Sequence, residues 1–347
     1  MVRAGGPTYT TFDVPGAGTG DFLGTVPINI APDGTVVGYT RDEAAARHGF
    51  VRDSDGTVTT FDAPNAGTGD SQGTRAYSIT PGGVVAGYFT DALSMAHGYV
   101  RTRQGVITVF DVPGASQGTF VGGFGFPSIT PGGVITGYYA DTNNFHGYVR
   151  DRQGVIAVFD APGASAAVGG TAAVSINPQG VIVGSYVDAN FTNHGFLRSK
   201  QGDITTLDVP AAGNVPFQGQ GTLPVTISAT GIVGGFYYDA NSVQHCFVRD
   251  RSGAVASFDV PADAPPNSFC NEVWGIAPDG TSVGTYLDAN FNPHAFLRDK
   301  TGALTTIDVP FPAAVNGTEA LGINPAGVIT GDWRDSNFTL HGFVRTP

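Results

Sequence analysis

The chain has 347 residues, of which 41% are hydrophobic and only 13% are charged. So few charged residues exclude a coiled coil or a charged helical array, and apolar runs of only a few residues exclude the roughly 20-residue segment that spans a bilayer. Asp and Glu number 29 against 17 Lys and Arg, a formal net charge of −12, which excludes nucleic acid and membranes as expected partners.

One unit recurs along the whole chain. Residues 73–113 represent it: β-branched and aromatic runs at 73–80, 84–90, 97–101 and 106–111 alternate with Gly- and Pro-containing turns, which predicts four short strands. The third run carries the motif His-(Gly/Ala/Cys)-(Phe/Tyr)-(Val/Leu)-Arg, and the fourth ends in (Phe/Leu/Ile)-Asp-(Val/Ala)-Pro. All seven histidines of the chain begin the first of these motifs: His48, His97, His146, His194, His245, His294 and His341.

Seven such units predict an all-β fold, a seven-bladed β-propeller with four antiparallel strands per blade. The chain opens with a fourth-strand segment at 9–13 and ends with a third-strand segment at 341–345, so the N-terminal strand should complete the last blade and remove an open edge. A β-solenoid is the alternative. It is less consistent with the sequence, because a solenoid does not need one repeat to be divided between the two ends of the chain. The chain is thus a single domain, 1–347, with blades at approximately 24–64, 73–113, 122–162, 170–210, 221–261, 270–310, and 317–347 plus 8–15.

The repeat resembles the HAF family of bacterial extracellular repeats. The resemblance rests on Ile-Asn-Pro-x-Gly-Val-Ile-x-Gly followed by the histidine motif, and it is clearest in His-Ala-Phe-Leu-Arg at 294–298; most copies here have Gly in place of Ala. It implies a propeller-like, exported protein and carries no catalytic residues to transfer. The N-terminal residues contain no apolar signal core. We expect a secreted protein whose signal segment is absent from this sequence, because the composition is poor in Lys and rich in Gly, Thr and Asn.

The repeated polar residues are expected to be structural. Each His follows an Asp across a loop, so an Asp–His contact would hold that loop, and the repeated Arg is expected to pair with acidic residues. On the first strands, large side chains such as Tyr77 and Trp274 are expected to interlock with small ones of the neighbouring sheet. Cys246 and Cys270 could form one disulfide, although their strand positions suggest a separation too large for easy bridging.

Departures from the repeat are the better indication of function, since binding usually resides in loops on a rigid scaffold. One first-strand position is charged in only three repeats, where it holds Glu272, Glu319 and Arg75; the others have Val26, Gly125, Ala172 and Leu223. These residues and further departures all fall in repeats six, seven, one and two, near the predicted mouth of the central channel. The further members of the expected binding set are Glu43, Arg41, Arg334, Trp274, Trp333 and Asn271.

These residues predict a ligand site for a glycan at the channel mouth. Glu272 and Glu319 are the candidate catalytic pair, because two nearby carboxylates provide the acid and base of glycoside hydrolysis. Hydrolysis is favoured over a lyase reaction, since every His belongs to the repeat.

Other interpretations remain open. The two glutamates could form ion pairs between blades, or bind calcium together with loop carbonyls. The chain could be a non-catalytic scaffold or protein-interaction module, or a small-molecule hydrolase or lactonase with a metal in the channel. No cofactor motif is present, and a monomer is favoured.

Overall fold

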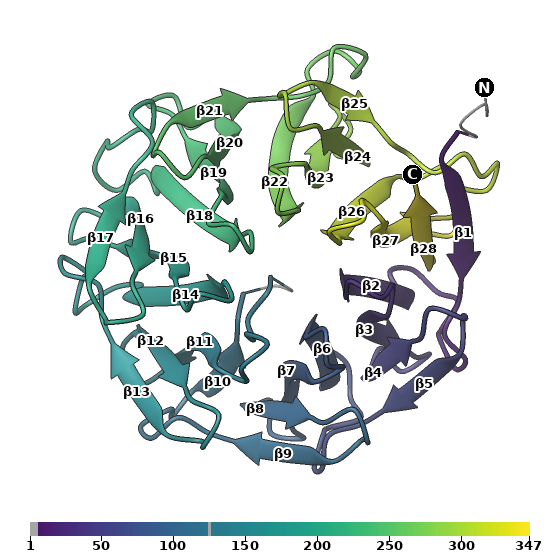
Figure 1. The fold of residues 1–347 in the computed structure, drawn as a ribbon, viewed down its shortest axis with the longest axis horizontal. Helices are drawn as coiled ribbons and strands as arrows, with labels where there is room; N and C mark the ends of the chain where they lie inside the picture. The colour runs from purple at the N-terminus through teal and green to yellow at the C-terminus, as the bar shows by residue number, and fades with distance from the viewer. Residues whose placement is uncertain (1–5, 124–125) are drawn as a thin grey trace.

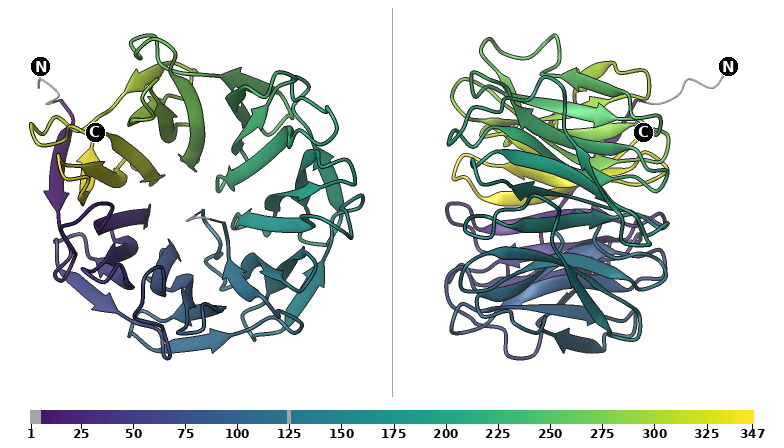
Figure 2. Two further views of the ribbon diagram at one scale, coloured as in Figure 1. Left: turned by 180° about the vertical axis from the view of Figure 1, so that it is seen from behind. Right: turned by 90° about the vertical axis from the view of Figure 1, so that its left-hand side faces the viewer.

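The computed structural model describes residues 6–123 and 126–347. These residues form 28 β-strands, arranged as a ring of four-stranded antiparallel sheets around a central axis (Figure 1). The side view in Figure 2 shows the ring as a thick disc. The described residues contain no helix long and apolar enough to cross a membrane. The fold is therefore all-β and propeller-like, as the repeat predicts.

The strands of repeats one to four follow the sequence order. Repeat one contains β2 (Gly24–Ile30), β3 (Val36–Arg41), β4 (Arg47–Arg52) and β5 (Val58–Phe61). Repeat two contains β6 (Gly73–Ile79), β7 (Val85–Thr90), β8 (Ala96–Arg101) and β9 (Ile107–Phe110). Repeat three contains β10 (Gly118–Val121), β11 (Ile135–Ala140), β12 (Phe145–Arg150) and β13 (Ile156–Phe159). Repeat four contains β14 (Thr171–Ile176), β15 (Ile182–Val187), β16 (Asn193–Arg198) and β17 (Ile204–Leu207).

The last repeat combines the two ends of the chain. Repeat five contains β18 (Gly221–Ile227), β19 (Val233–Tyr238), β20 (Gln244–Arg249) and β21 (Val255–Phe258). Repeat six contains β22 (Phe269–Ile276), β23 (Ser282–Leu287), β24 (Pro293–Arg298) and β25 (Leu304–Thr306). Repeat seven contains β26 (Thr318–Ile323), β27 (Ile329–Arg334), β28 (Leu340–Thr346) and β1 (Thr8–Phe12). β1 pairs antiparallel with β28, with Phe12 opposite Gly342, so the N-terminal strand completes the sheet of the C-terminal strands, as predicted.

Adjacent repeats meet where a first strand begins beside the third strand of the preceding repeat. Gly24 forms a short parallel bridge with Leu340, and Gly73 forms one with Arg47. Gly24 has a φ of +117°, and a Cβ atom there would overlap the carbonyl group of Leu340. Glycine is therefore required at this junction by both conformation and space.

Aromatic residues of the third strands form the core between sheets. The third residue of each histidine motif has no exposed surface; the seven residues are Phe50, Tyr99, Tyr148, Phe196, Phe247, Phe296 and Phe343. Removing one such ring costs about 3–5 kcal/mol. Preceding them in the motif, Gly98 and Gly147 leave room for the rings of Phe110 and Phe159 on the adjoining fourth strands. The motif is thus a packing requirement of the repeat.

The large residues of the first strands do not interlock with the neighbouring sheet as expected. In six repeats such a residue is the extra residue of a β-bulge, between Pro27 and Asn29 in repeat one, for example. Ile28, Tyr77 and Leu321 of three consecutive repeats pack together, and Trp274 packs against them. A bulge bends the strand and redirects a side chain, so these side chains gather beside the channel.

Repeat three departs from the predicted register. Its first strand, β10, begins only seven residues after Asp111. Thr119 on this strand accepts a hydrogen bond from the amide of Val112, which fixes the register of β10. The predicted blade boundary at 122 therefore falls after this strand and not before it. The chain then leaves the sheet and returns at the bridge between Ile129 and Ile135. Gly125, which the sequence comparison aligned with Glu272, lies outside the described residues.

Cys246 and Cys270 form a disulfide, contrary to the separation suggested by their strand positions. Their Cα atoms lie 5.7 Å apart, because the third strand of one repeat touches the first strand of the next. The bond connects repeats five and six. In the other repeats the position of Cys270 is a buried threonine that accepts a hydrogen bond from the backbone after the motif aspartate; these threonines are Thr25, Thr74, Thr119, Thr171, Thr222 and Thr318.

Candidate functional site

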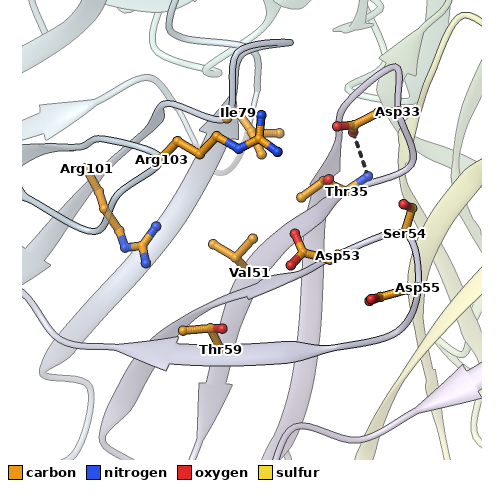
Figure 3. Close-up of a pocket in the computed structure, with 11 residues that line it drawn as sticks. Asp33, Thr35, Val51, Asp53, Ser54, Asp55, Thr59, Ile79, Arg101 and Arg103 are labelled. Atoms are coloured by element: carbon orange, nitrogen blue, oxygen red, sulfur yellow. Dashed lines mark hydrogen bonds between the residues drawn. The ribbon is translucent and has the colours of Figure 1, made fainter.

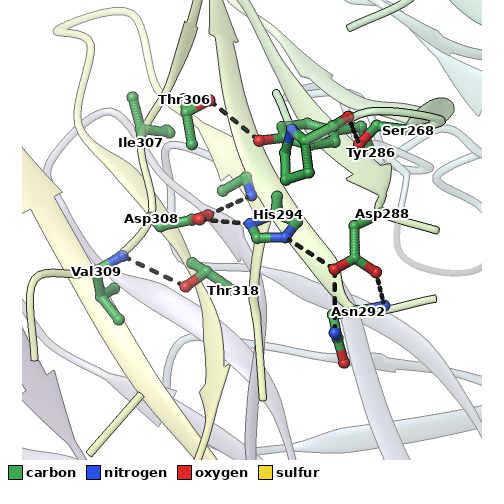
Figure 4. A network of polar contacts seen from close by, with 12 residues as sticks. Ser268, Tyr286, Asp288, Asn292, His294, Thr306, Ile307, Asp308, Val309 and Thr318 are labelled. Atoms are coloured by element: carbon green, nitrogen blue, oxygen red, sulfur yellow. Dashed lines mark hydrogen bonds and ion pairs between the residues drawn. The ribbon is translucent and has the colours of Figure 1, made fainter. Parts of the chain in front are cut away.

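Each motif histidine lies between two aspartates, as Figure 4 shows for repeat six. Nδ1 of His294 lies 2.6 Å from Oδ2 of Asp308, and Nε2 lies 3.8 Å from Oδ2 of Asp288. Asp288 also accepts hydrogen bonds from the amides of Asn290 and Asn292, which holds the loop between the second and third strands. The hydrogen bond to Asp308 raises the pKa of His294. The predicted contact with the loop aspartate is therefore present, whereas the shorter contact with the fourth-strand aspartate was not predicted; both belong to the repeated scaffold.

Six of the seven repeated arginines, all except Arg249, pack on aromatic rings, contrary to the predicted pairing with acidic residues. The guanidinium carbon of Arg101 lies 4.6 Å from the centre of the Phe61 ring, and that of Arg150 lies 4.7 Å from the centre of the Phe110 ring. Each ring belongs to the fourth strand of the preceding repeat, so the contact also connects sheets. The aspartate of the same fourth-strand motif lies at the opposite end of the third strand, where it meets the histidine.

The candidate site lies on the face that carries the second-to-third and fourth-to-first connections, called here the loop-rich face. The first strand of each repeat is its innermost strand (Figure 1) and begins on this face. Glu272 on β22 pairs across the sheet with Thr285, and Glu319 on β26 pairs with Asp332 on β27. The region around these strand starts is called here the channel mouth.

Three carboxyl groups lie together where repeats six and seven meet. Oε1 of Glu319 lies 3.3 Å from Nη2 of Arg334. Burial, reinforced by the negative charge of Glu319, raises the pKa of Glu272 to about 8. The same two causes raise the pKa of Asp332 well above its usual range; this side chain is 1% exposed, and its Oδ1 has no hydrogen-bond partner among the described residues. A protonated Glu272 therefore lies near an ion-paired Glu319 at neutral pH.

Two arginines of repeat one extend the charged group beyond Arg334. Arg41 and Arg47 are direct cross-strand partners on β3 and β4. Their guanidinium carbons lie 5.8 and 5.9 Å from the centre of the same Tyr39 ring. Burial and the positive charges of Arg75 and Arg41 lower the pKa of Arg47. Like charges directly opposite one another destabilise a sheet, so the fold tolerates an unfavourable pair at this position.

Arg75 of repeat two is fixed by its neighbours. Its Nη1 donates to Oγ1 of Thr90 at 3.0 Å and its Nη2 to the carbonyl of Ser71 at 2.7 Å. The guanidinium carbon lies 5.0 Å from the centre of the Tyr88 ring, and the side chain is only 8% exposed. Arg75 therefore contributes positive charge to the channel mouth, while its terminal nitrogens are already used in hydrogen bonds.

An aromatic pair lies in the channel below the charged residues. Trp274 of repeat six stacks on Phe126 of repeat three, with ring centres 5.3 Å apart and planes 16° from parallel. Phe126 follows β10 in repeat three and Trp274 lies on β22 in repeat six, so the stack joins two repeats that are not neighbours in the ring (Figure 1). Phe126 is 2% exposed, so the pair forms a floor beneath the channel mouth.

Three residues of the expected binding set make structural contacts. Oε1 of Glu43 accepts hydrogen bonds from the amide and the hydroxyl of Thr19, which fixes two loops to each other. Trp333 is buried in the closing sheet, where its indole donates to β1 and stacks on the motif histidine. Asn271 lies at a bulge, and its carbonyl accepts a hydrogen bond from Gln244. Contrary to expectation, Glu43 and Trp333 thus do not join the group at the channel mouth.

Three residues of the site were missed from the sequence. Arg47 and Asp332 are the only charged residues at their repeat positions, and the comparison that found Glu272 and Glu319 would have found them as well. Phe126 gave no such signal, because it lies in the segment where repeat three leaves the common register.

Exposed phenylalanines lie in or next to the connections of the loop-rich face. The side chains at least 38% exposed are Phe22, Phe145, Phe191, Phe217, Phe291 and Phe338. Ring centres are 5.8 Å apart in the pair Phe22–Phe338 and 5.3 Å apart in the pair Phe191–Phe217. These four residues have φ values from +57° to +62°. A bulky residue in this left-handed region costs about 1 kcal/mol or more, so the loops hold exposed rings despite local strain.

A hollow of about 350 Å³ lies on the other face, between repeats one and two (Figure 3). Turn residues line it, with Asp53 and Asp55 opposite Arg101 and Arg103. No residue of the channel mouth contributes to it. Within residues 6–123 and 126–347, no three His, Cys, Asp or Glu side chains are grouped so that they could hold a metal ion.

Comparison with known proteins supports the fold. No protein-family profile and no curated protein matches the sequence, so membership of the HAF family stays a prediction. The chain is similar to an oligogalacturonate lyase in complex with manganese, with a TM-score of 0.58 at 9% identity over 98% of this chain and 96% of that chain.

Two further solved structures are also similar. For a post-proline cleaving enzyme from Rickettsia typhi the TM-score is 0.50 at 12% identity, over 95% of this chain and 50% of that chain. For the six-bladed β-propeller lectin of Aleuria aurantia it is 0.42 at 11% identity, over 94% and 93%. At such identities the likeness concerns the fold alone, and the structures that support it are the two with TM-scores of 0.58 and 0.50.

Proposed function

We propose that this chain is a secreted, seven-bladed β-propeller that binds a glycan at the channel mouth and hydrolyses it. The observation that carries the proposal is the pair of unlike carboxyl groups: Glu272 has a pKa raised to about 8, and Glu319 is ion-paired with Arg334. The exposed rings of Phe22, which contacts Arg334, and of Phe338 are surfaces on which a sugar ring can stack. The Cys246–Cys270 disulfide supports an oxidising, extracellular location.

The two carboxyl groups have the properties that glycoside hydrolysis needs. Glu272, protonated at neutral pH, donates its proton to the bridging oxygen as the bond between that oxygen and the anomeric carbon breaks. Glu319 accepts a proton from the water that adds to the anomeric carbon. One water is consumed for each bond cleaved. A proton then passes from Glu319 to Glu272 through solvent, so that the acid is protonated again before the next cleavage.

The test is a panel of neutral and acidic polysaccharides with a reducing-end assay, in parallel with a binding measurement. We expect new reducing ends from at least one polysaccharide, and Glu272→Gln should lower turnover at least 100-fold because the amide cannot donate the proton. The matched control is Glu43→Gln, since Glu43 is a glutamate of the same face with a loop-fixing role. Its turnover should match that of the wild type.

Other outcomes separate the alternatives. Binding without turnover would refute hydrolysis and leave a glycan-binding module. Neither binding nor turnover on any polysaccharide would overturn the proposal and favour a scaffold that displays its loops to a protein partner.

A further inference from the structure

Positive charge exceeds ionised carboxylate at the channel mouth, although the whole chain is acidic. Arg41, Arg47, Arg75 and Arg334 contribute four guanidinium groups. Among the residues that the structure describes, Arg334 alone of the lysines and arginines has a carboxylate within ion-pair distance, at Glu319. Three of the four guanidinium groups are therefore left without a carboxylate partner.

The unpaired guanidinium groups also have unused donors. Nη1 of Arg47 is buried and has no hydrogen-bond partner, and it is the one terminal guanidinium nitrogen of which this holds in the described parts of the chain. Nε of Arg41, Arg47 and Arg334 is also without a partner, as it is in five of the repeated arginines. Buried donors are normally satisfied, and each exception requires an explanation. The equivalent cross-strand pairs of other repeats contain no second charge, as in Thr90 opposite Ala96. The arginine pair is thus specific to repeat one and is not required by the fold.

The nearby carboxyl groups do not neutralise this charge. Burial raises the pKa of Glu272 to about 8 and that of Asp332 well above its usual range, which favours the uncharged form of both side chains. Of the three carboxyl groups where repeats six and seven meet, Glu319 is the one in an ion pair, and its partner is Arg334.

An exposed aromatic pair adjoins the arginines directly. The guanidinium carbon of Arg334 lies 5.5 Å from the centre of the Phe22 ring, and Nη1 of Arg41 donates to the carbonyl of Phe22 at 2.9 Å. Phe22 is 44% exposed and pairs with Phe338. A ring stacked on these phenylalanines would have any acidic substituent within reach of both guanidinium groups.

We infer that the glycan bound at the channel mouth is anionic, with carboxylate or sulfate groups held by Arg41, Arg47 and Arg334. Guanidinium groups bind both anions through paired hydrogen bonds. This inference rests on the proposed function, since it names the class of glycan that the same site takes. Arg75, whose terminal nitrogens are already bonded, adds to the positive field.

The experiment compares charged and neutral forms of the same polymers by isothermal titration calorimetry. Alginate is tested against carboxyl-reduced alginate, and dextran sulfate against dextran. We expect the charged form of at least one pair to bind at least tenfold more tightly than its neutral form. The pair that shows the difference distinguishes carboxylate from sulfate recognition.

Variants connect the preference to the arginines. Arg47→Gln and, as a second variant, Arg41→Gln should each weaken binding of the charged polymer about tenfold or more without weakening binding of the neutral one. Arg103→Gln is the matched control, because Arg103 lies on the opposite face; it should bind like the wild type. Thermal unfolding establishes that each variant is folded.

The failures are distinguishable. Equal binding of charged and neutral glycans would overturn the inference while the proposed glycan binding stands. Binding of charged polymers that both arginine variants leave unchanged would also overturn it. Binding of none of these polymers would overturn both proposals.

Discussion

Replacing Glu272 with glutamine should stabilise the protein in a way that depends on pH. At pH 4 the glutamate is protonated in both the folded and the unfolded state, so Glu272→Gln should unfold like the wild type. Above about pH 4.5 the unfolded side chain ionises, while the folded one keeps its proton up to about pH 8. The wild type therefore loses stability relative to the variant across this window, and the difference becomes constant above it.

The size of this effect follows from the pKa of about 8. Moving a carboxyl group from its ordinary pKa to this value corresponds to about 5 kcal/mol at most, since each tenfold change is about 1.4 kcal/mol. Solvent reaches part of this half-buried side chain, so we expect roughly 2–3 kcal/mol at pH 9. For a chain of this length that is roughly 3–4 °C in Tm.

Thermal unfolding of both proteins at pH 4, 6, 8 and 9 measures the difference. The control is Glu43→Gln, the same exchange at an exposed glutamate of the same face. The reasoning is refuted if the Glu272→Gln difference stays flat between pH 4 and 9, or if the variant is the less stable protein at pH 9.

Three further predictions concern the scaffold. His294→Ala should lower Tm more at pH 6 than at pH 9, because the raised pKa of this histidine makes its contribution present below about pH 6.5 and lost as the pH rises through the folded value. Reducing the Cys246–Cys270 bond should lower the free energy of unfolding, measured in urea, by about 3 kcal/mol. The double variant Cys246→Gly and Cys270→Thr, which introduces the residues found in other repeats, should recover part of this lost stability. Phe126→Ala should cost about 3 kcal/mol and shift the indole emission of Trp274, and unchanged emission would contradict the stacked pair.

Local sequence patterns were sufficient where each repeat satisfies its own requirements. The histidine motif determined a third strand and the contact of its histidine with the loop aspartate, because these partners lie within one repeat. The contact with the fourth-strand aspartate and the burial of the aromatic residue of the motif were found only in the structure. The position of β1 beside β28 also followed, since an incomplete first unit and an incomplete last unit leave only one way to complete the sheets.

Contacts between repeats were harder to predict. The arginines pack on rings of the preceding sheet, and Cys270 reaches a strand of the preceding repeat. Both contacts depend on the distance between two neighbouring sheets at the position of the residue along its strand. Periodicity along one strand carries no information about that distance.

The sequence by itself determined the all-β repeat, its strand order and the arc of unusual charges, because these are properties of residue type and spacing. Only the tertiary structure decided that Glu272 shares its surroundings with Glu319, that Arg41 faces Arg47, and that a stacked aromatic pair lies beneath them. The physical reason is that closure of the ring brings side chains from distant repeats to one axis. Burial there changes which of them carry charge.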